Sequence, residues 1–549
     1  MLIFAALLQN LLFTPSRNGK IRLLVDHFRT VPDPERGLAL AAITRDLDIP
    51  SVKPALLREL VSNRVDEELF RLSYDYVGDL AETVALIWPV PGGEREDRND
   101  APTLSEVVDA LLAASRREGP ALVEGWLDRL DASGRYALIK LVTGGFRIGV
   151  SARLAKQALA DFGQVPVEEI EELWHGLEPP YESLFAWLEG EADKPVSAAL
   201  APFRPVMLSH PVEDGDFSRL DAADFAGEWK WDGIRVQASV DNGVKRLYSR
   251  TGDDISGAFP DLVDALGFEG TLDGELLIAR PLTNATGIEI GTFSDLQQRL
   301  NRKRLTAKIL KDHPAFLRIY DVLVDGGEDL RSLPFHERRT RLENLAETFD
   351  PRRFDLSPLV EFSTWEELAA LRAEPPLPMI EGVMIKRWEA PYLAGRPRGE
   401  WFKWKRDPFL IDAVLLYAQR GHGKRSGYYS DYTFGVWREE EGSRELVPVG
   451  KAYFGFTDEE LKTIDRYVRN NTIERFGPVR SVRAEPEKGL VLEVAFEGVN
   501  RSTRHKSGVA MRFPRISRLR WDKPPAEADT LEAVEALIAG PAVDVEGGA

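Results

Sequence analysis

The segment Glu228–Arg235 (EWKWDGIR) alternates charged and aromatic side chains with the period of a β-strand. Because successive side chains of a strand point to opposite faces, Glu228, Lys230 and Asp232 share one face and the two tryptophans share the other. The aromatic face suits a hydrophobic core. The segment therefore predicts a half-buried strand that carries a lysine between two carboxylates, although a surface lysine between acids is often merely solvated.

Four later segments repeat this design. They are Leu272–Leu276 (LDGEL), Tyr320–Leu323 (YDVL), Glu381–Lys386 (EGVMIK) and Trp401–Lys405 (WFKWK). Each predicts a strand with one apolar and one charged face. If these strands converge, they enclose a pocket with one special lysine, several carboxylates and a set of cations. Such a pocket can bind a nucleoside triphosphate with a divalent metal, because carboxylates ligate Mg²⁺, cations bind phosphate and an aromatic ring stacks on the base.

Taken in order, these motifs resemble those of the ATP-dependent DNA ligases, which share a covalent nucleotidyltransferase superfamily with mRNA capping enzymes and RNA ligases. The series comprises EWKWDGIR, Ser249-Arg250, LDGEL, IYDVL, EGVMIK, WFKWK and MRFPR. A single motif of this kind occurs by chance, whereas the whole ordered set is specific. The resemblance covers the last two-thirds of the chain, and the first third resembles the DNA-binding domain of the larger ligases.

The chain of 549 residues is long enough for several domains. We expect an all-α DNA-binding domain over residues 1–200, where apolar residues such as Leu7 and Leu11 recur with helical spacing. The catalytic motifs define an α+β nucleotidyltransferase domain with antiparallel sheets, an ATP-grasp-like ligase core, over residues 201–405.

Short strands and many glycines predict a C-terminal OB-fold β-barrel over residues 406–525. A capping box at Thr457–Leu461 predicts one helix among these strands. Residues 526–549 are Ala- and Gly-rich, and we expect a tail with a short helix at Thr530–Ile538.

The absence of cysteine and the distribution of charge narrow the choice of nucleotide donor and of binding partner. The chain has no cysteine, which excludes disulfides and cysteine-ligated zinc. The NAD-dependent DNA ligases carry a four-cysteine zinc finger, so its absence favours ATP as the donor. The net charge is −18, yet Arg501–Lys523 holds eight basic residues and one acidic residue. Local patches decide nucleic-acid binding, so this stretch predicts contact with nucleic acid or nucleotide.

Lys230 is the expected nucleophile. It attacks the α-phosphate of ATP and forms a lysyl-AMP phosphoamide while pyrophosphate leaves. Because a free lysine is protonated at neutral pH, we expect Lys403, Lys405 or a metal ion to lower its pKa. The same cations would stabilise the charge that develops on the phosphoryl oxygens.

The resemblance implies roles for the other motif residues. Glu381 is the expected metal ligand, and Glu275 lies near the ribose and shares the metal. Glu228 reads the adenine edge. Tyr320 stacks on the adenine, at a position where the family often has phenylalanine.

The resemblance also implies that Arg235 and Arg250 lie near the nucleotide sugar and phosphates. Arg512 orients the pyrophosphate in the first step, and its domain then swings away so that DNA can bind. We expect Arg406–Asp407 to act as the pivot of this motion.

Two N-terminal segments are candidates for contact with the duplex backbone. Thr14–Lys20 predicts a helix start whose amides can face phosphate. Gly144–Gly149 is a glycine-rich turn that the residues alone interpret as a connection between helices; the resemblance implies backbone contact. The expected contacts are Arg17, Asn18, Gly145, Arg147 and Gly149, with Arg515 in the third domain.

These expectations describe an ATP-dependent DNA ligase that seals nicks through lysyl-AMP and a DNA-adenylate. ATP and Mg²⁺, or Mn²⁺ in its place, are the expected cofactors, and a monomer would act on nicked double-stranded DNA beside repair or replication proteins. An RNA ligase or capping-type guanylyltransferase is an alternative, and a non-catalytic DNA-binding scaffold is another. With no membrane-spanning stretch or targeting signal, we expect a cytoplasmic, nucleoid-associated protein of a bacterium or archaeon.

Overall fold

The computed structural model describes residues 1–77, 79–89, 100–195, 199–213, 215–282, 287–300, 302, 305–420, 427–440, 442–477, 479–502, 505–538 and 542–544. The chain forms two compact units, Met1–Pro205 and Val206–Ala549. Every described β-strand belongs to the second unit. Among the described residues, no helix combines the length and the apolar character that crossing a lipid bilayer requires.

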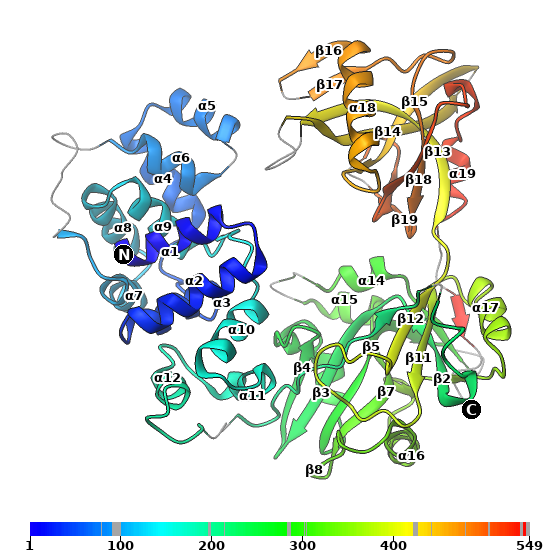
Figure 1. Cartoon of the computed structure of the whole chain (residues 1–549), viewed down its shortest axis with the longest axis horizontal. Helices are drawn as coiled ribbons and strands as arrows, with labels where there is room; N and C mark the ends of the chain where they lie inside the picture. The colour runs from blue at the N-terminus through cyan, green and yellow to red at the C-terminus, as the bar shows by residue number, and fades with distance from the viewer. Residues whose placement is uncertain are drawn as a thin grey trace. The chain divides into compact units, whose positions relative to one another are not determined.

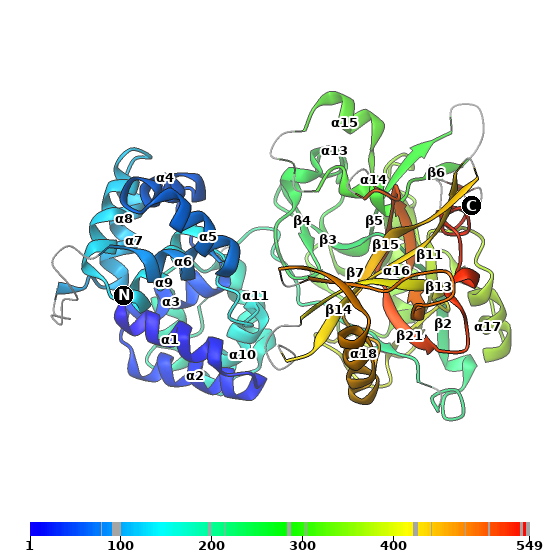
Figure 2. The same cartoon turned by 90° about the horizontal axis from the view of Figure 1, so that it is seen from above.

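The first unit is all-α, as expected (Figures 1 and 2). Its helices are α1 (Leu2–Phe13), α2 (Arg17–Thr30), α3 (Glu35–Thr44), α4 (Pro54–Arg64), α5 (Glu67–Val77), α6 (Leu80–Ile87), α7 (Leu104–Ala113), α8 (Glu118–Arg129), α9 (Ala132–Thr143), α10 (Ala152–Gly163), α11 (Val167–Leu173) and α12 (Glu182–Leu188). The apolar spacing at the chain start is that of α1, whose Leu7 and Leu11 lie in one shared core with residues of α2 and α9.

The second unit begins with two mainly antiparallel sheets, each of which includes one parallel strand pair. The first has the strand order β1-β12-β11-β2-β10. Its strands are β1 (His210–Pro211), β2 (Phe225–Trp231), β10 (Leu359–Val360), β11 (Ile380–Arg387) and β12 (Trp401–Lys405). Only the part EWKW of the segment EWKWDGIR lies in β2, which ends at Trp231, so the expected place of Asp232 on this strand is wrong. Trp231 is buried in a small apolar cluster and Trp229 packs against it. The predicted core face of this strand is therefore confirmed.

The second sheet is built around β5. Its strands are β3 (Ile234–Asp241), β4 (Val244–Ser249), β5 (Gly270–Pro281), β6 (Ile288–Ile290), β7 (Ala315–Asp325), β8 (Glu328–Asp329), β9 (Phe354–Leu356) and β22 (Ala542–Asp544). The helices of this part of the chain are α13 (Pro260–Ala265), α14 (Phe293–Gln297), α15 (Ala307–Asp312), α16 (Phe335–Ala346) and α17 (Trp365–Ala373), of which α17 packs on β11 of the first sheet. Helix α16 packs on β7, where Arg338 and Asp321 form a fully buried ion pair at 2.8 Å.

The C-terminal part is a curled antiparallel β-structure of the expected OB type. It contains β13 (Phe409–Arg420), β14 (Tyr429–Glu440), β15 (Ser443–Ala452), β16 (Thr472–Phe476), β17 (Val479–Val482), β18 (Val491–Phe496) and β21 (Arg515–Arg520), with a separate hairpin of β19 (Gly498–Arg501) and β20 (Val509–Arg512). Helix α18 (Asp458–Asn470) packs on β14 (Figure 2). Its N-cap Thr457 forms the predicted capping box with Glu460.

The barrel continues past residue 525, where we expected a tail to begin. The short helix is α19 (Leu531–Glu535), and its Leu531 and Val534 are 7% and 0% exposed within the barrel core. The backbone N–H of Asp412 donates to the Asp529 carboxylate at 2.7 Å, which fixes the segment before the helix. Two apolar residues at helical spacing thus outweigh the Ala- and Gly-rich composition, and the segment up to α19 belongs to the barrel.

Candidate active site

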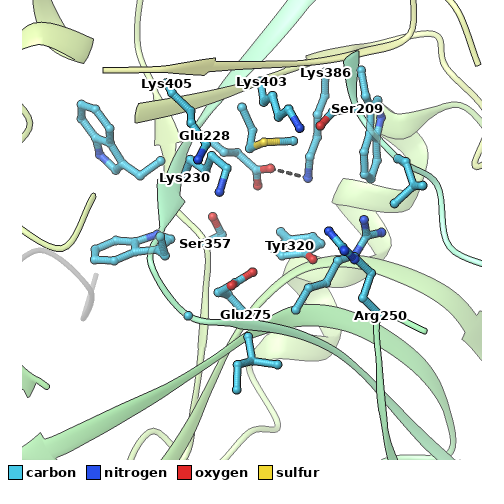
Figure 3. Close-up of a pocket in the computed structure, with 18 of the residues that line it drawn as sticks. Ser209, Glu228, Lys230, Arg250, Glu275, Tyr320, Ser357, Lys386, Lys403 and Lys405 are labelled. Atoms are coloured by element: carbon cyan, nitrogen blue, oxygen red, sulfur yellow. Dashed lines mark ion pairs between the residues drawn. The ribbon is translucent and has the colours of Figure 1, made fainter. Parts of the chain in front are cut away.

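A pocket of about 540 Å³ lies between the two sheets of the second unit. Lys230, Lys403 and Lys405 reach it from the sheet of β2, β11 and β12 (Figure 3). Glu275 on β5 and Tyr320 on β7 reach it from the opposite sheet. Residues from four separate motifs therefore line one cavity.

Strand register places two of these lysines on either side of a glycine. Gly382 on β11 pairs with Lys230 on β2 and with Lys405 on β12. Side chains of directly paired residues lie on the same face of a sheet. Gly382 has no side chain, and β11 and β12 approach so closely there that an added Cβ would lie 2.3 Å from the Trp404 carbonyl oxygen.

A β-bulge places an acidic residue, Glu381, beside the row formed by Lys230, Gly382 and Lys405. Ile380 pairs with Trp231 and Gly382 with Lys230, so Glu381 is the additional residue on β11. A bulge re-aims side chains that strict alternation would send to the other face. The Glu381 carboxylate consequently lies 2.7 Å from the Lys230 Nζ and 3.6 Å from the Lys405 Nζ.

The charge state of Lys230 differs from the expectation. Burial lowers the pKa of Lys230, but the carboxylates of Glu381 and Glu275 outweigh burial and raise the pKa above its ordinary value. Lys403 and Lys405 therefore do not lower the pKa of Lys230 against its paired acid, and lowering by a metal ion stays a prediction. Lys403 is the lysine whose pKa is lowered, first by burial and then by neighbouring cations such as Arg396.

The two expected metal ligands have different charge states. Burial raises the pKa of Glu275 to about 8, although Lys230 and Arg235 act against it. Burial would also raise the pKa of Glu381, but Lys230 and Lys405 hold that pKa below its ordinary value. An additional cation beside Glu275 would relieve the cost of burying its charge.

The pocket suits Mg²⁺ bound together with a nucleotide. Among the described residues, no group of three acidic or histidine side chains could hold a metal without further ligands. Mg²⁺ is usually bound through one or two carboxylates plus water and substrate phosphates. Glu275 and Glu381 could supply these carboxylates, and the lining lysines could hold the phosphates.

Glu228 lies at the other end of the pocket in a buried charged cluster. It is 2% exposed and forms an ion pair with Lys386 (Figure 3), which is 1% exposed. Arg339 on α16 approaches the same carboxylate at 3.4 Å. The Lys386 ammonium lies 4.4 Å from the centre of the Tyr320 ring and 4.7 Å from that of Trp401. Aromatic rings therefore line this end of the pocket, and ion pairs hold the Glu228 carboxylate in place.

Sequence reasoning missed several of these residues. Lys386 ends the EGVMIK motif on the same face as Met384, and this spacing could have assigned it to the pocket. Arg339 comes from a helix with several arginines and gave no signal in the sequence. Other unassigned lining residues are Leu208, Ser209, Phe293, Ser357, Arg396 and Trp401.

Arg235 and Tyr320 are held by one buried acid. The guanidinium of Arg235 donates to both oxygens of Asp273, at 3.1 and 2.6 Å. The Tyr320 hydroxyl donates to the same carboxylate at 3.2 Å. Asp273 is the first acid of the LDGEL motif, so this motif supplies one anchor and one pocket acid, Glu275. Arg250, at the end of β4, also lines the pocket.

The barrel contributes two cations beside the lysine row. Arg512, at the end of β20, forms an ion pair with Asp232, and its guanidinium carbon lies 4.8 Å from the centre of the Phe293 ring. Arg515 lines a smaller pocket of about 100 Å³ with Asp232 and Glu381. Arg512 lines this smaller pocket as well and does not line the pocket of about 540 Å³, so its contact with a nucleotide stays a prediction.

The two expected DNA-contact segments adjoin within the first unit. Ser16 caps α2 by accepting from the Gly19 N–H at 3.0 Å. Lys20 donates through its Nζ to the carbonyl of Ile148 and so ties α2 to the turn after α9. The exposed expected contacts in these segments are Arg17, Asn18, Arg147 and Gly149, whereas Gly145 is half-buried. These residues could follow one stretch of phosphate backbone.

Comparison with known proteins agrees with this arrangement. The family model "ATP dependent DNA ligase domain" matches residues 206–405, and "ATP dependent DNA ligase C terminal region" matches residues 425–523. The "Probable DNA ligase" of Koribacter versatilis (strain Ellin345) is 34% identical over 465 residues, which cover 79% of this chain and 78% of that protein. "DNA ligase 1" of Korarchaeum cryptofilum (strain OPF8) is 31% identical over 560 residues, covering 97% of each. A solved structure named "Pmar-Lig_PreS3" has a TM-score of 0.56 at 14% identity over 94% of this chain and 99% of that chain, which supports the fold alone.

Proposed function

The chain belongs to the ATP-dependent DNA ligases, and from this premise we propose that Lys230 accepts the adenylate in the pocket between the two sheets. The observation that carries the proposal is the row of Lys230, Gly382 and Lys405 with Glu381 beside it. It supplies a nucleophile, a phosphate-binding cation and a carboxylate within one small volume.

In the first step, the neutral Lys230 Nζ attacks the α-phosphorus of ATP. A nitrogen–phosphorus bond forms and the nitrogen releases one proton to solvent, while the bond from the α-phosphorus to the bridging oxygen breaks, so pyrophosphate leaves with the electron pair. Lys403 and Lys405 bind the phosphate oxygens and stabilise their developing charge. A divalent cation at Glu275 and Glu381 would supply positive charge that neutralises both carboxylates and favours loss of the Lys230 proton.

The base and sugar bind at the other end of the pocket. The Glu228 carboxylate accepts a hydrogen bond from the adenine amino group, and the Tyr320 ring stacks on the base. Arg235 and Arg250 bind the ribose and phosphates. Guanine presents a carbonyl where adenine has its amino group, so an ionised Glu228 disfavours GTP.

The later steps require the barrel to leave the pocket. Arg406–Asp407 precedes β13 and is the proposed pivot. AMP then passes from Lys230 to the 5′-phosphate of the nick, and the 3′-hydroxyl displaces AMP to form the phosphodiester. Arg17, Asn18 and the turn at Gly145–Gly149 hold the duplex through its backbone, and Arg515 adds a contact from the barrel.

We propose Mg²⁺ as the metal, with Mn²⁺ able to replace it, and a monomer as the working form. The relatives reported above come from a bacterium and an archaeon. In such cells the DNA lies in the cytoplasm, so we place the protein with the nucleoid.

Intact-protein mass after incubation with Mg²⁺ and ATP, GTP or NAD⁺ tests the proposal. We expect an acid-labile AMP adduct from ATP alone, which is absent in Lys230→Ala and disappears on addition of nicked duplex DNA. Lys245→Ala is the matched control, because Lys245 lies on β4 and donates to the Asp264 carbonyl at 3.1 Å, outside the pocket lining.

A guanylate adduct would instead support a capping-type enzyme. The lack of any adduct in folded protein that is free of pre-bound AMP would favour a scaffold. The intact set of charged pocket residues, Lys230, Glu275, Lys403 and Lys405, speaks against that alternative.

A further inference from the structure

The β19–β20 hairpin presents two opposite charges from the same end. Gly498 pairs with Arg512, and the Glu497 N–H donates to the Arg512 carbonyl at 3.0 Å. The side chains of Glu497 and Arg512 therefore leave neighbouring backbone positions. Arg512 pairs with Asp232, whereas Glu497 pairs with Lys405 at 2.8 Å.

Lys405 is shared between two sites. Its Nζ lies 2.8 Å from Glu497 and 3.6 Å from Glu381. Its side chain lines the large nucleotide pocket and also the smaller pocket that contains Glu497. The side chains of Lys405 and Glu497 are 39% and 28% exposed, so the pair is accessible to a competing anion.

We propose that Glu497 competes with the phosphates of ATP and pyrophosphate for Lys405. This inference rests on the proposed function of the pocket. Carboxylates and phosphates bind an ammonium through the same charge-assisted hydrogen bonds. Retaining Glu497 on Lys405 while a triphosphate binds would place like charges side by side, so the ammonium exchanges one partner for the other.

The exchange sets the affinity of the pocket for phosphate-bearing ligands. Whenever Lys405 is held by Glu497, it is unavailable to ATP, and the apparent affinity falls by the fraction of time spent in that pair. The same exchange favours the departure of pyrophosphate, because Glu497 takes Lys405 back. Partly exposed ion pairs are weak, so the expected effect is about two- to fivefold.

A purely positioning role for Glu497 predicts the opposite result. If the carboxylate only held Lys405 in place to bind phosphate, its removal would weaken ATP binding and slow the transfer. The sign of the change in KM for ATP therefore separates competition from positioning.

The test is single-turnover adenylylation of the full chain with Mg²⁺ over a range of ATP concentrations. In Glu497→Gln, we expect the KM for ATP and the inhibition constant of pyrophosphate to fall together by about two- to fivefold. Nick sealing by pre-adenylated enzyme without ATP is expected to stay at the wild-type rate. An unchanged or raised KM for ATP would overturn the proposal.

Two control experiments test whether the change in the KM for ATP arises from the pair of Glu497 and Lys405. Glu493→Gln makes the same chemical change on β18, where Glu493 pairs with Arg518 at 3.0 Å, and should leave both constants unchanged. In a Lys405→Gln background, Glu497→Gln should have no further effect on the KM for ATP, because the contested cation is gone. A full effect in that background would also overturn the proposal.

The inference and the proposed function fail in different ways. Wild-type enzyme that forms no lysyl adduct refutes the proposed function, and with it the competition. Wild-type enzyme that adenylylates normally, together with a Glu497→Gln variant of unchanged KM, refutes only the competition. A thermal unfolding curve for Glu497→Gln establishes that the variant is folded, and Glu497→Ala gives a second variant for the same comparison.

Discussion

Gly382→Ala should damage both the stability and the first chemical step of this ligase. Gly382 has φ +146°, which L side chains rarely adopt, and a Cβ added there would lie 2.3 Å from the Trp404 carbonyl and 2.7 Å from the Lys405 Cα. The backbone conformation costs about 1–3 kcal/mol for a non-glycine residue. Forcing β12 away to admit the methyl group costs about 1–3 kcal/mol more. We therefore expect a loss of about 2–6 kcal/mol in the free energy of unfolding.

The same displacement should slow adenylylation. Lys405 and Gly382 are directly paired, so moving β12 shifts a phosphate-binding cation relative to Lys230. A misplacement of about 1 Å at a reacting centre can lower the rate about 10²-fold. Single-turnover formation of lysyl-AMP at saturating ATP, in variants shown to be folded at the assay temperature, measures this loss apart from stability.

Two further glycines of the same domain separate the causes. Gly257 has no heavy atom within 4 Å of an added Cβ and no positive φ, so Gly257→Ala should change the free energy of unfolding by less than about 0.5 kcal/mol. Gly243 has φ +79° and the same open space, so Gly243→Ala should cost about 1 kcal/mol from the backbone alone. If Gly382→Ala unfolds like Gly243→Ala and adenylylates at the wild-type rate, the reasoning about the lysine row is wrong.

Three other predictions follow from single contacts. Glu381→Gln removes the proposed metal ligand, which lies 2.7 Å from the Lys230 Nζ, and should slow adenylylation about 10²-fold or more; a loss under tenfold in single-turnover assays would contradict its role. Ending the chain at residue 525 removes Leu531 and Val534 from the barrel core and should cost about 3–5 kcal/mol in denaturant unfolding, so an unchanged midpoint would place them outside the cooperative core. Burial lowers the pKa of His27 to about 4, so the unfolded chain binds the proton first, and stability should fall by up to about 3 kcal/mol as pH drops from about 6.5 to 4. His27→Leu should unfold with a smaller pH dependence, and an equal dependence would refute this assignment.

The sequence could predict those structural features that depend on residues close together along the chain. Alternation in EWKWDGIR predicts β2 and its buried Trp231 because the strand period is local. The Thr457 capping box predicts the start of α18 because three residues satisfy one another. The ordered motifs then predicted that Lys403 and Glu275 meet at one site, which their positions in the pocket confirm.

Features set by long-range register could not be predicted in this way. The bulge at Glu381 depends on how β11 meets β2, and the pair it creates joins residues 151 positions apart. Arg339 reaches Glu228 from α16 only because that helix packs on β7 in the folded chain. The tail was misjudged for a related reason, since composition alone does not show that Val534 has a barrel to pack against.

The charge state of Lys230 shows why register matters for chemistry as well as for fold. From the sequence motifs, Lys403 and Lys405 are expected to lower the pKa of the nucleophile Lys230. In the folded chain the bulge moves Glu381 against Lys230, and the pKa of Lys230 is raised instead. A protonated lysine is not a nucleophile, so the Glu381 carboxylate opposes activation of Lys230. The carboxylate that suppresses Lys230 is also the proposed metal ligand, so occupation of Glu381 by a cation couples metal binding to activation of the nucleophile.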